Sequence, residues 1–455
     1  MIEPLPQKTD STSRQLPNWC VGLISFGLCW TIFVGYYHFK FDLNGPPSTS
    51  GDEVDYDSIG WELAHGRGFA VNTEDPDFRE PYDIAAKTAE RFKLTPRPRW
   101  EVTYRPPLYP YAISYLNRLF GRQFWATRIM DAGFMAGTLA LIVMTLYPRY
   151  GWHSVVIALG LFIVIDVRTR LYGRAILTES MSLFFTSIIC IALLRLQRMQ
   201  RAKLPEILLH SALIGFTFGF SMLARTMMIL WGPGMCLTLY WIIRKLKFNF
   251  RQSVLAVTVF LVGTGVVLTP WAVRNIKLTE KMMPLGTQGL VQLSAGFGDS
   301  IWESNGLWPN IETEGFFDGV IEPQASQLEN EIAKAEYSKA EALKWILANP
   351  MKAALLAPTK MYQECRPRNP TEWIISALML LGIWSIGRTP IGKVLLAVFA
   401  INLFAIAATW SVEGRFLVPV LFPIHIFASV GLLVVLQPFL RKIGIESTSE
   451  APALP

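Results

Sequence analysis

The segment WCVGLISFGLCWTIFVGYY, Trp19–Tyr37, is almost wholly apolar, and the polar stretch GDEVDY follows it at Gly51–Tyr56. A helix of about 20 apolar residues is long enough to cross the hydrocarbon core of a bilayer. Three carboxylates, those of Asp52, Glu53 and Asp55, therefore lie close to the point where the chain leaves the first predicted span. Charge at this boundary can face water, a lipid headgroup and a substrate together, which predicts chemistry at the membrane surface.

The composition is that of a membrane protein. Of 455 residues, 51% are hydrophobic and only 17% are charged, whereas soluble domains carry about a quarter of charged residues. The net charge of +7 does not indicate nucleic-acid binding, because most basic residues fall in short loops between apolar segments. Four of the five cysteines lie in apolar segments, so no disulfide framework or cysteine metal site is predicted. The first segment is too long for a cleaved signal sequence and is expected to be a signal anchor.

Nine further apolar segments predict about ten crossings in total. They are 124–147, 152–167, 175–194, 207–223, 227–243, 254–273, 373–386, 394–410 and 416–436. Basic residues in the loops set the orientation, since Lys and Arg are enriched on the cytoplasmic side. The basic loops are 195–203, 244–251 and 388–393, with Arg441 and Lys442 after the last span, and alternating crossings put them all on one side.

This topology divides the chain into a cytoplasmic tail (1–18), a transmembrane module (19–440) and a cytoplasmic, disordered tail (441–455). The opposite side carries two long segments, called here the first long loop (38–123) and the second long loop (274–371). Within the second, residues 325–347 are rich in Glu, Lys and Ala and predict a solvated helix. No Asn-x-Ser/Thr acceptor is present, which favours the cytoplasmic membrane of a bacterium.

The acidic cluster has two interpretations. Ser50 and Glu53 have the spacing of a helix capping box, and carboxylates in a first turn suit the helix dipole. Alternatively, Asp52 supplies a general base at the membrane face. Asp52 and Asp55 are three residues apart and share a helix face, whereas Glu53 points elsewhere.

Arginines on the predicted external side suggest an anionic partner such as a phosphate. Arg105 lies in YRPPLYP, where prolines keep the chain extended, so it either faces a lipid phosphate or leads into the next span. Arg274 ends a span and either neutralises a leaving group or anchors the helix end. Arg174 lies in a short turn that opposes the positive-inside bias. Glu179 opens the span after it, where a carboxylate can also reach the surface as a simple helix-end residue.

The order of these motifs resembles the GT-C class of polytopic glycosyltransferases, and in particular a bacterial group akin to protein O-mannosyltransferases and aminoarabinose lipid A transferases. The matching motifs are Asp52-Glu53-x-x-Tyr56 continuing as Ala64-His65-Gly66-Arg67-Gly68, then Arg105-Pro106-Pro107-Leu108-Tyr109-Pro110, Thr178-Glu179, Pro270-Trp271 with Arg274-Asn275, and Arg415-Phe416 leading to Pro419. The resemblance implies an all-α polytopic GT-C fold with about ten or more transmembrane helices and two large external loops.

The resemblance also implies an inverting glycosyltransferase. Such an enzyme moves a sugar from a polyprenyl-phosphate donor to a hydroxyl of a lipid, glycan or protein acceptor on the external face. By motif position Asp52 is the base and Arg105 faces the donor phosphate, with Arg274 and Arg174 as further phosphate ligands. Glu53, Asp55 and Glu179 are candidates for catalytic or metal support, and a divalent cation is left open.

The chain departs from the family at Asp55, since some relatives carry a basic residue just before the motif tyrosine. Two alternatives also stay open, a flippase or other transporter of lipid-linked sugars and an inactive membrane scaffold. A transporter is expected to gather its polar groups near the midplane, whereas here they gather on one side. The sequence names neither the sugar nor the acceptor.

Overall fold

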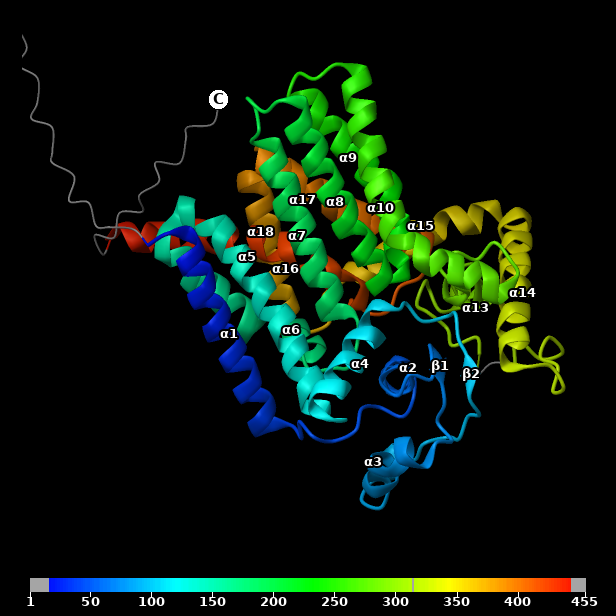
Figure 1. Cartoon of the computed structure of the whole chain (residues 1–455). Helices are drawn as coiled ribbons and strands as arrows, with labels where there is room; N and C mark the ends of the chain where they lie inside the picture. The colour runs from blue at the N-terminus through cyan, green and yellow to red at the C-terminus, as the bar shows by residue number, and fades with distance from the viewer. Residues whose placement is uncertain (1–15, 313–314, 443–455) are drawn as a thin grey trace, which may run out of the picture.

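The computed structural model describes residues 16–312 and 315–442, and nearly all of its regular structure is helical (Figure 1). Within these ranges, eight helices are long and apolar enough to cross a membrane. They are Asn18–Lys40 (α1), Phe124–Ile165 (α5, Phe124–Leu159, with η2, Gly160–Ile165), Glu179–Gln197 (α7), Leu204–Ala224 (α8), Thr226–Lys245 (η3, Thr226–Trp231, with α9, Gly232–Lys245), Phe250–Thr279 (α10), Pro390–Ala408 (α17) and Arg415–Phe439 (η4, Arg415–Val420, with most of α18, Leu421–Lys442). Pro370–Ile386 (α16) is apolar but shorter. The predicted class, an all-α polytopic membrane protein, is confirmed.

The sequence predicts ten apolar segments, whereas the described residues form eight long apolar helices and the shorter α16. The long element α5 accounts for the difference of one. Gly151 has φ 61° and ψ −157°, which breaks α5 into two helices. Glycine adopts this positive φ without the penalty that a Cβ atom imposes. The two arms correspond to the predicted segments 124–147 and 152–167.

Close helix packing in the bundle depends on glycine at a few positions. A Cβ atom on Gly382 of α16 would lie 1.9 Å from the carbonyl oxygen of Phe427, and one on Gly431 of α18 would lie 2.0 Å from that of Leu378. Small residues at such contacts let two backbones approach closely, which is how helices pack where lipid removes the usual hydrophobic drive. The α16–α18 contact is therefore backbone against backbone.

The first long loop folds into a small layer against one end of the bundle. It contains Asp52–Ala64 (α2), Ala70–Val71 (β1), Pro76–Ala86 (α3), Glu90–Phe92 (η1), Trp100–Glu101 (β2) and Leu108–Phe120 (α4). A further short helix, Val167–Tyr172 (α6), lies outside this loop and follows α5 and η2. The two short strands pair antiparallel. Ile59, Leu63, Val71 and Val102 pack with Trp271 of α10 in one apolar cluster, which fixes this layer to the end of a span.

The second long loop contains Gln288–Val291 (α11), Leu293–Gly296 (α12), Asp299–Glu303 (α13), Gln327–Ala348 (α14) and Pro350–Cys365 (α15). The predicted helix at 325–347 is confirmed as α14, and its first turn is closed by a capping box between Ser326 and Glu329. Helix α15 was not predicted. It crosses toward the bundle beside α13 and α14 (Figure 1).

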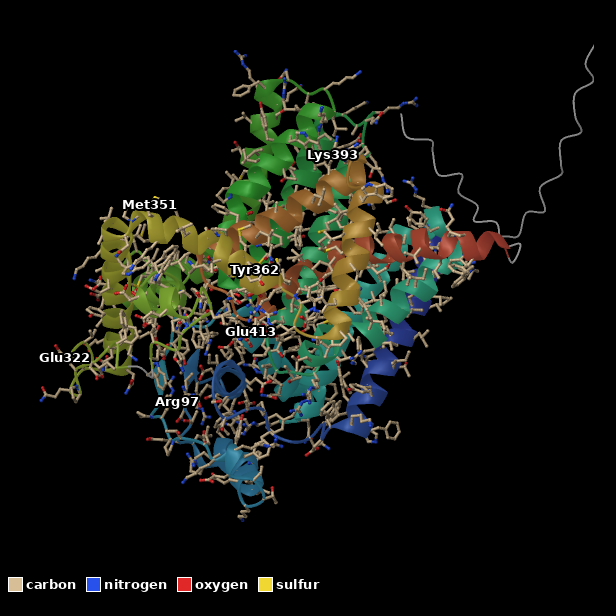
Figure 2. The ribbon with its side chains drawn as sticks, turned by 180° about the vertical axis from the view of Figure 1, so that it is seen from behind. Arg97, Glu322, Met351, Tyr362, Lys393 and Glu413 are labelled. Atoms are coloured by element: carbon tan, nitrogen blue, oxygen red, sulfur yellow. The ribbon has the colours of Figure 1, made fainter. Side chains whose placement is uncertain are left out.

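The two long loops lie at the same end of the bundle. Thr103 of the first donates to Glu331 of the second, at 2.6 Å. At the other end, Gln197 donates to the carbonyl of Pro390, which joins two of the predicted basic loops. Figure 2 shows Lys393 at this end, well separated from Arg97 and Glu413 at the end that carries the loops.

We expect the end with Arg198 to be cytoplasmic and the end with the long loops to be external. The reason is the concentration of Lys and Arg in the short loops of one end only. Arg198→Cys in intact cells is expected to resist an impermeant thiol reagent, whereas Glu322→Cys in the second long loop is expected to react. Labelling of Arg198→Cys from outside would invert the topology.

Candidate active site

A cavity of about 1120 Å³ lies where the bundle meets the two long loops. Its wall is built by the first turn of α2, the Tyr104–Pro106 segment, the start of η3, the second long loop and the residues between α17 and η4. Pockets for small ligands usually enclose about 300–1,000 Å³. The cavity is therefore large enough for two small molecules, or for one head group with part of its chain.

Asp52 lies in the cavity wall between two arginines. One carboxylate oxygen accepts from Arg105 Nη1 at 2.5 Å and the other from Arg415 Nη2 at 2.7 Å. Burial by itself would raise the pKa of Asp52, but the charges of Arg105 and Arg415 outweigh it and hold the pKa well below its usual range. The side chain keeps 23% of its surface exposed, so the carboxylate is ionised and still accessible from the cavity.

Asp55 holds the opposite side of Arg105. One of its oxygens accepts from Arg105 Nε at 3.1 Å and Nη2 at 2.6 Å, and the other accepts from Arg97 Nη2 at 2.7 Å. Arg105 also lies over the rings of Tyr56 and Tyr104. Two carboxylates and two rings fix this guanidinium in one orientation. Arg97 brings a positive charge beside Asp55, the position at which some relatives in the resemblance carry a basic residue.

Glu179 completes the charged cluster from the start of α7. Its buried carboxylate accepts from Arg225 Nη1 at 2.7 Å and from Arg415 Nε. Arg415 therefore bridges Asp52 and Glu179, which are 127 positions apart in the sequence numbering. Arg225 lies at the break between α8 and η3, where the chain ends one span before it starts the next.

Glu53 joins two backbone segments instead of closing a capping box. The predicted capping box between Ser50 and Glu53 is therefore wrong. The N-cap of α2 is Gly51, with φ 79° and no capping side chain. Glu53 instead accepts from the backbone N–H of Ser48 at 2.7 Å and of Ile176 at 3.0 Å. Because both carboxylate oxygens are engaged, Glu53 joins the start of the first long loop to the segment before α7.

The structure does not bring Arg174 or Arg274 to the lining of the cavity. The guanidinium of Arg174 lies 3.7 Å from the ring centroid of Phe41. Arg274 donates to the carbonyls of Val102 at 2.9 Å and Phe69 at 3.2 Å. Arg274 thus fastens the paired strands β1 and β2 of the first long loop to α10. A role at the donor phosphate stays a prediction that this geometry does not support.

We expect Arg274→Ala to lower thermal stability while leaving the Michaelis constant for the donor nearly unchanged. The substitution removes hydrogen bonds from a charged group to two backbone carbonyls, which typically costs about 1.5–3 kcal/mol. Melting of the purified variant and its donor titration are the two measurements. If the variant has wild-type stability but a much weaker affinity for the donor, Arg274 binds the donor phosphate and the structural assignment is wrong.

The carboxylates at the cavity do not form a ready metal site. Among the described residues, no group of three or more His, Cys, Asp or Glu side chains lies close enough together to hold a metal ion. Each oxygen of Asp52 and Asp55 already accepts from an arginine. A divalent cation at these oxygens would have to displace a guanidinium group.

Of the four arginines at the site, only Arg105 has a role that the sequence motifs predict. Arg97 lies in a loop with no motif, and only its contact with Asp55 reveals it. Arg225 carries one signal, an arginine between two predicted spans at their external ends. Arg415 belongs to a matching motif, but its contacts with Asp52 and Glu179 join segments that are distant in sequence.

No family model and no curated protein matches the chain. The fold defines a polytopic all-α membrane protein with a charged cavity at one end of its helix bundle.

The chain is similar to solved structures of ArnT from Cupriavidus metallidurans. The structure bound to undecaprenyl phosphate shares 15% identity over 95% of this chain and 81% of the other, with a TM-score of 0.40. The apo structure shares 15% identity over 95% and 80%, with a TM-score of 0.36. Similarity at this level transfers no residue role, so the roles proposed below come from the contacts of this chain.

Proposed function

We propose that the chain is an inverting glycosyltransferase that moves a sugar from a polyprenyl-phosphate donor to an acceptor hydroxyl at the external face of a bacterial cytoplasmic membrane. One observation carries the proposal. An ionised carboxylate, that of Asp52, lies in a large cavity at the end of the spans and is held between two fixed guanidinium groups, those of Arg105 and Arg415.

The two guanidinium groups suit the donor phosphate. Arginine binds phosphate oxygens through paired N–H groups, and charge develops on the phosphate as the sugar leaves. A phosphate placed between Arg105 and Arg415 would take over hydrogen bonds that Asp52 now accepts. Each arginine keeps a second carboxylate, Asp55 or Glu179, and so stays in place during this exchange.

The released carboxylate suits the acceptor. A hydroxyl is a weak nucleophile until a base takes its proton. In a single displacement, the acceptor oxygen bonds to the anomeric carbon, its proton passes to Asp52, and the bond between that carbon and the phosphate oxygen breaks with its electron pair going to the phosphate. Direct attack from the opposite side inverts the anomeric configuration.

Purified protein in lipid nanodiscs tests the proposal. A panel of polyprenyl-phosphate sugars is offered with a mixture of lipid, glycan and peptide acceptors, and free polyprenyl phosphate is measured. Donor-dependent release of polyprenyl phosphate that needs an acceptor supports the transferase. If no donor is consumed but labelled lipid-linked sugar crosses a vesicle membrane, the protein is a flippase. If the protein neither transfers the sugar nor moves it across the membrane, it is a scaffold.

A further inference from the structure

We propose that Glu364 is a positioning residue that holds Arg415 against Asp52 and Glu179. Through Glu364, the second long loop controls whether Arg415 is placed to contact the donor phosphate. This inference rests on the proposed function. Glu364 lies near the C-terminal end of α15, and its side chain is fully buried.

The carboxylate of Glu364 accepts hydrogen bonds from both sides of Arg415. One oxygen accepts from Ser411 Oγ at 2.7 Å and from the N–H of Val412 at 2.8 Å. The other accepts from the N–H of Phe416 at 2.5 Å. The backbone from 411 to 416 therefore curves around one buried carboxylate, and the side chain of Arg415 projects from that curve to the cavity.

The curve has a backbone conformation that needs such support. Glu413 has φ 48° and Gly414 has φ 87°, both in the left-handed region. A non-glycine residue in this region is uncommon and persists where the surroundings fix it. Further support comes from the second long loop, because Trp308 donates its N–H to the carbonyl of Ser411 at 2.9 Å. Figure 2 shows Glu413 close to the C-terminal end of α15, which carries Tyr362.

Precise placement matters because Arg415 serves two carboxylates through two different nitrogens. Nε reaches Glu179 and Nη2 reaches Asp52 at 2.7 Å. A displacement of about 1 Å at a positioning group can slow catalysis about 10²-fold. Loosening the 411–416 curve is therefore expected to weaken the contact of Arg415 with the donor phosphate, although Glu364 itself touches neither substrate.

Glu364→Gln tests this role with little change of shape. The amide places an NH₂ group against at least one of the three donors, so the curve loses a hydrogen bond and gains a repulsive contact. We expect turnover to fall about 10–10²-fold. Glu372→Gln is the matched control, because Glu372 is a neighbouring carboxylate that accepts from the N–H of Arg368 and does not contact the 411–416 curve. Its turnover is expected to stay within about twofold of wild type, the near-neutral range of substitutions away from special contacts.

A double-mutant cycle separates positioning from general stability. If Glu364 acts through Arg415, the turnover defect of Glu364→Gln disappears in an Arg415→Ala background, whereas any loss of thermal stability persists. Additive turnover losses, or full turnover in Glu364→Gln, would overturn the inference. Should Glu364→Gln fail to fold, Ser411→Ala removes one of the same hydrogen bonds and is expected to give a smaller loss that is also absent in the Arg415→Ala background.

A binding readout keeps this inference separate from the proposed reaction. Undecaprenyl phosphate is expected to raise the melting temperature of wild type and Glu372→Gln, and to raise that of Glu364→Gln much less. This pattern without sugar transfer by wild type would refute the reaction and leave the positioning role standing. Equal stabilisation of all three proteins, or of none, would refute the positioning role.

A second inference rests on the opposite face of α15. We infer that α15 lies in the external interface of the bilayer with an apolar stripe toward the lipid. Met351, Leu355 and Tyr362 are 73%, 53% and 65% exposed, and the exposed Ala354 and Pro358 lie between them on the same stripe. No charged residue shares the stripe, and an apolar helical face of this kind is typical of helices that lie at a membrane surface.

Helix α15 lies beside the ends of two apolar helices of the bundle, α16 and α17. Four residues, 366–369, join α15 to α16, where Trp373 is exposed. On the inner face of α15, Lys360 donates to the carbonyl of Ala407 in the last turn of α17, at 3.4 Å. The helix is therefore level with the external ends of α16 and α17. Figure 2 shows Met351 at the edge of α14 and α15 opposite to the one that carries Glu322.

Fluorescent labels on single cysteines in nanodiscs test this placement. A probe on Met351→Cys is expected to emit at shorter wavelength than in water and to be quenched by lipids that carry a nitroxide near the headgroup. The same probe on Glu322→Cys is the control and is expected to behave as in water. Water-like emission at both positions would overturn the inference, and a blue shift without lipid quenching would indicate a protein partner instead.

Discussion

Asp52→Asn is expected to slow sugar transfer by about 10²–10⁴-fold, the usual loss when a general base is removed. The variant keeps the shape of the side chain but lacks the proton acceptor. Some stability is expected to be lost with the ion pairs of Asp52, but the variant is expected to fold, because Arg105 keeps Asp55 and Arg415 keeps Glu179 as partners. Single-turnover transfer with saturating donor is the measurement. Near-normal transfer by Asp52→Asn would refute the assignment of the base.

Two neighbouring variants serve as controls for Asp52. Glu53→Gln alters contacts with two backbone N–H groups, so it is expected to reduce stability more than the chemical step. Asp55→Asn weakens the support of Arg105 and Arg97, so it is expected to impair donor binding. A loss of the chemical step in Asp55→Asn alone would move the base to that residue.

The pH dependence of Asp52 has a definite sign. Its pKa in the free protein is held below the usual range by Arg105 and Arg415, so the carboxylate stays ionised as the pH falls from 8 to about 5. The stabilising contribution of its ion pairs is present above the unfolded pKa of about 4 and is lost only as the pH falls through the lower, folded pKa. Because kcat/KM reports the free enzyme, its acid limb is not expected to come from Asp52.

The enzyme–donor complex is expected to behave differently. A donor phosphate that takes the arginines from Asp52 removes the cause of its low pKa, so the acid limb of kcat is expected to lie at a higher pH than that of kcat/KM. Coincident acid limbs would indicate that the arginines stay on Asp52 during the reaction.

Arg105→Ala is expected to give the second largest effect, a fall in kcat/KM of about 10–10²-fold, since a hydrogen bond to a charged group contributes about 1.5–3 kcal/mol. The same substitution leaves Asp55 half-paired and nearly buried, at 5% exposed. Breaking a buried ion pair typically costs about 3–5 kcal/mol of stability. Both activity and melting temperature of this variant are therefore expected to fall.

Arg105→Lys separates the two effects. Lysine keeps the charge but cannot reproduce the planar fork that reaches Asp52 and Asp55 together. We expect Arg105→Lys to retain most of the stability and to lose most of the donor affinity. Undecaprenyl phosphate is then expected to raise the melting temperature of the wild type more than that of Arg105→Lys. Full donor turnover in both variants would place the phosphate elsewhere in the cavity.

The sequence alone predicts the membrane class, the apolar segments and the end of the bundle at which polar groups gather. These features are local, because an apolar run of sufficient length must be a span and the basic loops set its direction. Asp52 and Arg105 could be named in advance for a similar reason. Each lies in a compact motif, and the sequence resemblance covers both motifs in order.

Which charges meet depends on how the helices and loops pack. Arg415 reaches Asp52 and Glu179 from the far end of the chain, and Glu364 holds the backbone that presents it. Arg274 carries the same charge in an equally plausible motif, yet its nitrogens are taken by backbone carbonyls. A guanidinium acts over the length of a hydrogen bond, and that distance depends on how helices and loops pack. The sequence therefore predicts where charges can gather, and packing selects the partners of each.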